Sequence, residues 1–126
     1  MPLEAGLNAR IELTIAEGDT ASAVGSGDVA VLATPRIIAL VEQAAVAAVT
    51  GNLADGETTV SMRVQLDHLA PASVGETVTA NAKLERIDGR RLTFSVSASD
   101  DRGLVAAGKL TRVVVERQRF LDRCQM

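Results

Sequence analysis

The side chains of Glu42, Thr34 and His68 carry three groups used in acid–base and nucleophilic catalysis: a carboxylate, a hydroxyl and an imidazole. Glu42 lies within residues 37–49, IIALVEQAAVAAV, where only Glu42 and Gln43 are polar. An ionised carboxylate in an apolar setting costs free energy unless it is paired or hydrogen-bonded. Proteins keep such groups mostly where chemistry or binding requires them. The segment therefore predicts a site around Glu42.

Each of these residues also has a purely structural interpretation. Glu42 could emerge at a subunit interface and pair with an arginine there. A lone histidine on an apolar strand face is more often a core residue, although Leu69-Ala70-Pro71 directly after His68 indicates a strand end, where a side chain can reach a cleft. A threonine before a proline at a helix start is usually only a cap. The residues alone leave these alternatives open.

The central helix is expected to begin at Thr34-Pro35, because a threonine can cap a helix and proline suits its first position. It should run from Pro35 to about Thr50 and end at Gly51-Asn52. Apolar residues occupy almost every face of its centre, which predicts a helix buried all round. In so short a chain, other elements must wrap it.

Alternation of polar and apolar residues predicts the strands. In residues 58–69, the side chains of Val60, Met62, Val64, Leu66 and His68 are expected to share one face. Asp88-Gly89 and residues 100–103 are turn signals. Residues 16–27 are rich in small and polar side chains and are predicted to be loop. Strands are expected at residues 8–15, 58–69, 77–84, 92–98 and 104–115.

The order of one strand, one helix and four strands joined mainly by short turns predicts an α+β fold, with an antiparallel sheet of about five strands wrapped around one long central helix. Short hairpins exclude a doubly wound parallel sheet, which needs crossover helices. A sheet of this kind has edges, and edges favour pairing with another chain. A homodimer or a higher homo-oligomer is therefore expected.

Composition excludes several classes of function. The 126 residues suit a single domain, 1–126. A net charge of -3 and two aromatic residues argue against binding to nucleic acid. One cysteine, Cys124, and one histidine leave no internal disulfide and no zinc cluster, so no metal is expected. The first ten residues lack a signal-peptide pattern and residues 37–49 are too short to cross a bilayer, which predicts a cytoplasmic protein without membrane attachment.

The motifs of the chain resemble those of the hot-dog-fold thioesterases, most closely the fluoroacetyl-CoA thioesterase-like group. The resemblance implies that Thr34, Glu42 and His68 form the active site, since that group has a threonine, a glutamate eight residues later and a histidine on the following strand. It also implies that Arg112 helps to position the substrate. The similar stretches are residues 33–45 (ATPRIIALVEQAA), 64–80 (VQLDHLAPASVGETVTA), 88–100 (DGRRLTFSVSASD) and 108–115 (GKLTRVVV).

The resemblance implies an acyl-CoA thioesterase that hydrolyses a small or medium acyl thioester to free acid and coenzyme A, with coenzyme A entering only as part of the substrate. Two alternatives remain: a non-catalytic acyl-CoA-binding protein, or another hot-dog enzyme such as a dehydratase or hydratase. The fluoroacetyl-selective enzyme has aromatic residues ahead of its threonine, whereas this chain has Asp28-Val29-Ala30-Val31-Leu32. Arg90-Arg91 is either a solvated hairpin or an attraction for the nucleotide end of coenzyme A.

Overall fold

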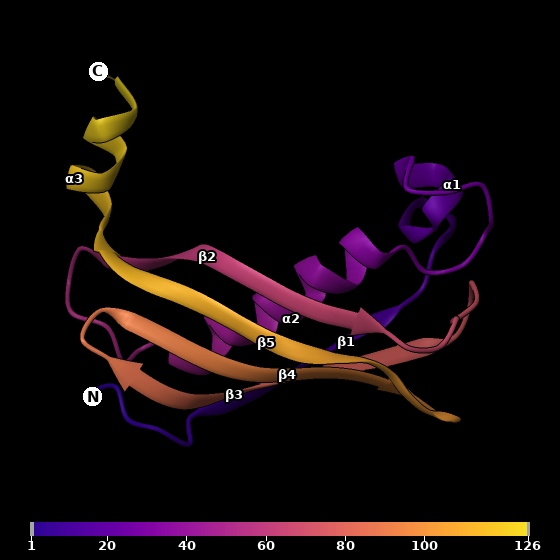
Figure 1. The fold of residues 1–126 in the computed structure, drawn as a ribbon, viewed down its shortest axis with the longest axis horizontal. Coiled ribbons are helices and arrows are strands. Elements are labelled where there is room, and N and C mark those ends of the chain that lie inside the picture. The colour runs from indigo at the N-terminus through magenta and orange to yellow at the C-terminus, as the bar shows by residue number, and fades with distance from the viewer. Residues whose placement is uncertain (1, 126) are drawn as a thin grey trace.

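The computed structural model describes residues 2–125 and consists of one curved antiparallel sheet with a long helix along one face (Figure 1). The strand order across the sheet is β1-β3-β4-β5-β2, so β1 and β2 are its two edges. The strands are β1 (Asn8–Thr14), β2 (Glu57–His68), β3 (Thr77–Asp88), β4 (Arg91–Asp100) and β5 (Gly103–Glu116). The helices are η1 (Glu17–Asp19), α1 (Ala21–Val24), α2 (Thr34–Val49), α3 (Arg117–Asp122) and η2 (Arg123–Gln125).

The core lies between α2 and the face of the sheet that the helix covers. Alternate residues of β3 and β4 point into it, as the sequence pattern predicts, and Phe94 is its largest fully buried side chain. Both turn signals form hairpins, with Gly89 and Gly103 at positive φ. The predicted α+β arrangement of five antiparallel strands and one long helix is confirmed. The buried residues of α2 are Ile37, Leu40, Val41, Ala44, Ala45, Ala48 and Val49.

The prediction that α2 is buried all round is wrong. Ala39, Gln43, Val46 and Ala47 are exposed, and Val46 retains 43% of its accessible surface. Five strands curl around only one side of the helix, so its other side stays uncovered within one chain. The apolar residues on that side therefore have no partner inside the subunit.

The predicted shared face of β2 holds for Val64, Leu66 and His68 but is wrong for Val60 and Met62, because the strand contains a bulge. Its pairing with β5 shifts between Ser61 and Arg63, which makes Met62 the extra residue. The bulge reverses the alternation: Thr59 is buried, whereas Met62 is exposed, and Val64 and His68 face α2 with Thr59. A prediction from alternation assumes a regular strand, so it assigns the residues before the inserted one to the wrong face.

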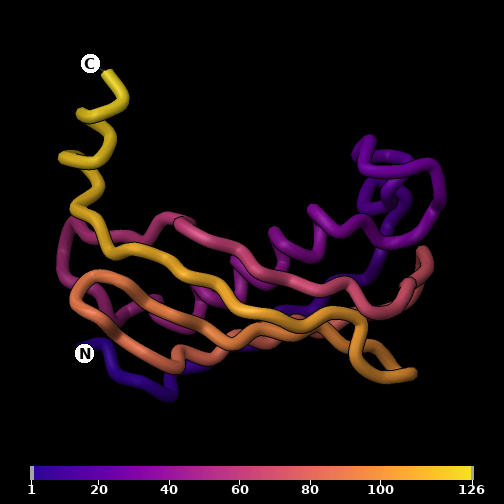
Figure 2. Tube along the Cα trace, viewed as in Figure 1, coloured from indigo at the N-terminus to yellow at the C-terminus, as the bar shows by residue number. Residues whose placement is uncertain are grey.

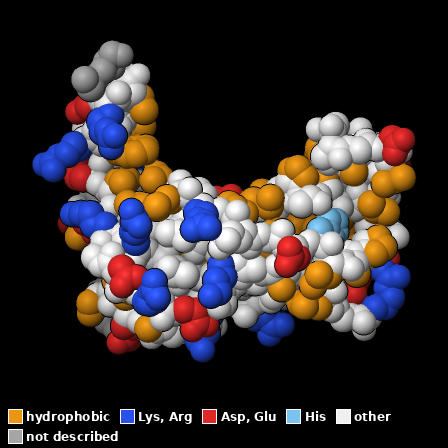
Figure 3. All heavy atoms as spheres, in the orientation of Figure 1, with side chains coloured by type: hydrophobic (Ala, Val, Ile, Leu, Met, Phe, Trp, Pro, Cys, Tyr) orange, Lys and Arg blue, Asp and Glu red, His pale blue; other side chains and the backbone are white. Residues whose placement is uncertain are grey.

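The segments flanking the core contain short helices that the sequence pattern does not predict. η1 and α1 lie within residues 16–27, where the composition predicts loop, and α3 continues directly from β5. In the chain trace, α1 and α3 rise at opposite ends of the molecule (Figure 2). The space-filling view shows a hollow surface between these two flanks (Figure 3). In residues 2–125, no helix has the length and apolar character needed to cross a membrane.

Gly108 allows β5 to lie close to β2. A Cβ atom at this position would overlap the carbonyl oxygen of Gln65 and lie 2.8 Å from the Cα of Leu66. Both are backbone atoms, so only separation of the strands relieves the overlap. We expect Gly108→Ala to lower the free energy of unfolding by about 1–3 kcal/mol, measured by denaturant titration. Gly18→Ala is the control, because a Cβ there meets no atom within 4 Å, and an equal loss in both variants would contradict the explanation.

Candidate active site

The first turn of α2 places Thr34 against His68 at the end of β2. The hydroxyl oxygen of Thr34 lies 2.7 Å from Nδ1 of His68, a hydrogen bond in which either atom can donate. The N-cap of α2 is Ala33, so Thr34 is not the cap that the sequence allowed. Nε2 of His68 is buried, and no hydrogen-bond partner within residues 2–125 reaches it. This nitrogen is therefore a buried polar atom whose hydrogen-bonding capacity is unused within the described residues.

The middle of α2 places Glu42 against Arg112 of β5. Arg112 donates from Nη1 to Oε2 of Glu42 at 2.9 Å, and the guanidinium is only 8% exposed. Nε and Nη2 of Arg112 donate to the hydroxyl and the carbonyl oxygen of Thr59, both at 3.0 Å. Thr59 thus fixes the arginine, which in turn fixes one oxygen of the carboxylate. The Glu42 side chain remains 28% exposed, so it is accessible from outside the core.

Residue type alone does not mark Thr59 as part of a site, because threonine is common in strands. The bulge at Met62 places the Thr59 side chain on the face of β2 that packs toward α2 and the core, which sequence alternation does not predict. The arginine partner of Glu42 is in the same chain, whereas the sequence suggested an arginine at a subunit interface. Arg112 contacts Glu42 and Thr59 in this structure, and contact with substrate stays a prediction.

The two pairs lie apart within one chain. Thr34 and Glu42 are eight residues apart on α2, a rise of about 12 Å at 1.5 Å per residue. On β2, Ser61, which is opposite Arg112, is seven residues from His68, roughly 20 Å of strand. Among residues 2–125, no hydrogen bond or ion pair joins the two pairs. A single subunit therefore presents two separate side-chain pairs rather than one assembled triad.

A cavity of about 250 Å³ adjoins the Thr34–His68 pair. Val31, His68, Leu69, Ala70 and Pro71 line it. Backbone hydrogen bonds fix its walls, with Leu32 N donating to Ala72 O at 2.8 Å and Leu69 N donating to Val105 O at 2.7 Å. Within residues 2–125 no three histidine, cysteine or acidic side chains gather in a metal-binding arrangement.

Asp19 ties the segment ahead of α2 to the helix itself. Its Oδ2 accepts from the backbone N–H of Ala16 at 2.8 Å, and its Oδ1 accepts from Nε of Arg36 at 2.9 Å. The Ala16 bond and, to a smaller extent, Arg36 hold the pKa of Asp19 below its ordinary value of 3.8. The backbone carbonyl of Asp19 also accepts from Ala33 N at 2.9 Å, so this anchor helps to place Thr34.

The ionised form of Asp19 should stabilise the fold. Because the folded-state pKa is lowered, this stabilisation is present above pH about 4 and is lost as the pH falls through the folded-state pKa. We expect Asp19→Asn to lower the melting temperature by a few degrees at pH 7, and the difference from wild type to shrink at lower pH. Thermal melts from pH 7 to pH 2 measure this. A difference that does not change with pH would contradict it.

A protein-family model described as fluoroacetyl-CoA-specific thioesterase matches residues 15–118. The chain belongs to this thioesterase family. The matched region includes Thr34, Glu42, His68 and Arg112, and the resemblance inferred from the sequence is confirmed at the level of the family.

Individual members of the family are similar along most of the chain. A fluoroacetyl-CoA thioesterase of Streptantibioticus cattleyicolor is 34% identical over 90 residues, which are 71% of this chain but only 65% of that protein. The solved structure of the fluoroacetyl-CoA thioesterase FlK superposes with a TM-score of 0.92 at 25% identity, covering 99% of this chain and 97% of that one. A variant of FlK solved with fluoroacetate and CoA gives 0.88 at 27% identity, covering 94% and 99%. The hot-dog fold is thereby confirmed.

Proposed function

We propose that this protein is an acyl-CoA thioesterase that hydrolyses a small or medium acyl thioester to the free acid and coenzyme A. The observation that carries the proposal is the Glu42 carboxylate, held by the buried Arg112 yet accessible, in a chain of a thioesterase family. A buried arginine paired with a catalytically idle glutamate costs desolvation without return. The solved FlK variant with fluoroacetate and CoA supports the substrate class.

Glu42 supplies the carboxylate for either of two routes. In the first, its free oxygen attacks the thioester carbonyl carbon, the C–S bond breaks to give an acyl–glutamyl anhydride and the thiolate of coenzyme A, and water then hydrolyses the anhydride. In the second, Glu42 takes a proton from a water whose oxygen attacks the same carbon. Arg112 is a positioning residue in both, since it fixes the other carboxylate oxygen through its bonds to Thr59.

The Thr34–His68 pair serves the leaving group and the carbonyl oxygen. We assign to His68 the proton that converts the departing thiolate to a thiol, because Nδ1 is bonded to Thr34 and Nε2 has no partner among the described residues. Arg36 N and Ile37 N both donate to Ala33 O, and Pro35 has no N–H. The backbone N–H of Thr34, at the positive end of α2, is therefore the group we assign to the thioester oxyanion.

The two side-chain pairs are half-sites that meet in a homodimer. β2 is an edge strand next to the uncovered side of α2, where Met62 and Val46 retain 49% and 43% of their accessible surfaces. An unpaired edge with apolar side chains beside it favours association. The hollow between the α1 and α3 flanks gives a second copy room to approach (Figure 3).

Two-fold symmetry then pairs the half-sites. If β2 of one copy pairs antiparallel with β2 of the other, the two α2 helices run antiparallel on the same face of a continuous sheet. In a two-fold interface, residue i faces j and j faces i. If the two α2 helices cross near Ile38, midway between Thr34 and Glu42, then Glu42 of one copy lies near Thr34 and His68 of the other. The two-fold axis repeats this contact, so it occurs twice per dimer.

The acyl group occupies the cavity beside His68. This cavity opens broadly to the surface, and its lining of Val31, Leu69, Ala70 and Pro71 is apolar, which suits a short aliphatic chain. Residues 16–33 contain no aromatic side chain that could close over the acyl group. We therefore propose selectivity for small unbranched acyl groups in general and not for fluoroacetyl in particular.

Release of free thiol from a panel of acyl-CoA thioesters tests the proposed function. The panel runs from acetyl-CoA and fluoroacetyl-CoA to decanoyl-CoA, and the acyl groups that fit the cavity should give the highest kcat/KM. Titration of the same panel by calorimetry gives binding. Binding without release of thiol across the panel would reject the hydrolase in favour of an acyl-CoA-binding protein.

A further inference from the structure

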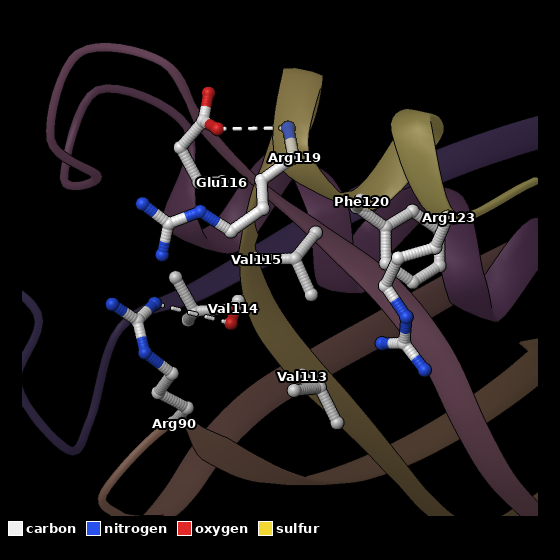
Figure 4. Close-up of a pocket in the computed structure, with 8 residues that line it drawn as sticks. All are labelled: Arg90, Val113, Val114, Val115, Glu116, Arg119, Phe120 and Arg123. Atoms are coloured by element: carbon white, nitrogen blue, oxygen red, sulfur yellow. Dashed lines mark hydrogen bonds between the residues drawn. The ribbon is translucent and has the colours of Figure 1, made fainter.

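A second cavity, of about 240 Å³, lies where α3 turns away from the end of β5 (Figure 4). Phe120 and Arg123 point over Val113 and Val115 on one side, and Arg90 and Arg119 stand on the other. Arg112 faces α2, whereas Val113 and Val115 alternate with it and face away, so this cavity is separate from the Glu42–Arg112 pair.

Positive charge exceeds negative charge among the residues that line this cavity, which include three arginines and one glutamate. Arg119 and Arg123 are four residues apart, a spacing at which like charges on a helix repel. Within residues 2–125, neither guanidinium makes a hydrogen bond or an ion pair. Both oxygens of the Glu116 carboxylate accept instead from the backbone N–H groups of Gln118 and Arg119. The chain as a whole carries a net charge of -3, so this local excess of positive charge is opposite in sign to the net charge of the protein.

Arg90 adds a third guanidinium to the same cavity. It donates from Nη1 to Val114 O at 3.2 Å and to Oε2 of Glu57 at 3.3 Å, and these contacts hold it at the cavity wall. Arg91 does not line the cavity. The structure thus separates two neighbouring arginines that the sequence could not tell apart, and it assigns only the first to the cavity.

We propose that this cavity binds an adenosine 3′,5′-bisphosphate group, the nucleotide end of coenzyme A. Guanidinium groups bind phosphate oxygens through paired N–H donors, and three of them suit a ligand that carries phosphates at two positions. The half-buried ring of Phe120 offers a flat apolar face to the adenine. The proposal deepens the proposed function by naming a site for part of its substrate, but the binding itself does not depend on hydrolysis.

The same group could come from two sources. The nucleotide either belongs to an acyl-CoA whose thioester lies in the active site, or it is a free nucleotide that binds independently of the substrate. The two sources present the same phosphate and adenine groups to the cavity, and enzyme kinetics distinguish them.

Titration of the full chain with adenosine 3′,5′-bisphosphate tests the proposal directly. We expect saturable binding that weakens with added salt, and at least about tenfold weaker binding by the double variant R119Q/R123Q, since that variant loses two charged donors to phosphate. Arg86→Gln is the matched control, because Arg86 is exposed, pairs with Asp88 and lies outside the cavity. No binding, or equal binding by wild type and R119Q/R123Q, would overturn the proposal. A loss of stability without a loss of binding would show that these arginines serve only α3.

Kinetics with matched substrates then identify the source. If the nucleotide belongs to the substrate, R119Q/R123Q should raise KM for an acyl-CoA and leave KM for the same acyl group on pantetheine unchanged, with kcat unaffected. If KM is unchanged for both while adenosine 3′,5′-bisphosphate binding is lost, the ligand is a free nucleotide. If no thioester is hydrolysed by wild type, the titration still decides the binding proposal separately from the proposed function.

Discussion

Replacing Glu42 by glutamine should lower kcat for acyl-CoA hydrolysis by about 1,000-fold or more, because an amide neither attacks a thioester carbonyl nor takes a proton from water. Glutamine retains an oxygen that can accept the hydrogen bond from Arg112, and Thr59 still holds the guanidinium. The fold should therefore persist, with an unchanged far-UV circular dichroism spectrum and acyl-CoA binding within a few-fold of wild type. Free-thiol release at saturating substrate measures the loss.

Glu76→Gln is the matched control for this result. Glu76 also pairs with an arginine, since its Oε2 accepts from Nη2 of Arg102 at 2.9 Å, but it lies just before β3 and lines neither the cavity beside His68 nor the cavity beside α3. It should keep nearly full activity. Wild-type activity in Glu42→Gln would remove Glu42 from the mechanism, and an equal loss in both variants would point to a general effect of lost ion pairs.

Replacing His68 by alanine should lower kcat by about 100-fold or more, since the leaving thiolate then departs without its proton donor. The loss should shrink for a thioester of a more acidic thiol, because a better leaving group needs less protonation. Thr34→Val, which removes only the hydroxyl that contacts Nδ1, should lower kcat by a smaller factor. Rates with a coenzyme A thioester and with a thiophenyl ester of the same acyl group measure both effects.

A purely structural role for His68 makes a different prediction. In that case His68→Ala would lower the melting temperature and leave kcat of the folded fraction unchanged for both thioesters. Because one ring nitrogen of His68 contacts only Thr34 and the other has no partner in the described chain, we expect the loss of stability to be small.

Local pattern was sufficient to predict the fold but not the exposure of its surfaces. The strand pattern of β3 and β4 and the turn at Asp88-Gly89 are set by residues close together in the sequence. Whether these elements form therefore depends little on the rest of the chain. How much of α2 is covered depends instead on how far the sheet curls, which is a property of all five strands together. Val46 and Ala47 are apolar in the sequence, yet they are exposed within one subunit.

The candidate site was predictable by residue type and not by contact. Residue chemistry drew attention to Glu42, and family resemblance added its spacing to Thr34 and His68. Neither gave the pairing of Glu42 with Arg112 through Thr59, because the bulge at Met62 decides which residues of β2 face α2. The separation of the two side-chain pairs also follows only from the three-dimensional arrangement.

The central claim is that Glu42 of one copy acts with Thr34 and His68 of the other. Co-expression of Glu42→Gln and His68→Ala chains carrying different affinity tags, followed by purification over both tags, isolates the mixed dimer. In it, one site has lost both groups and the other has kept both, so we expect about half of the wild-type kcat per dimer. If each site lay within one chain, both sites would lack one group, and activity no higher than that of the single variants would contradict the claim.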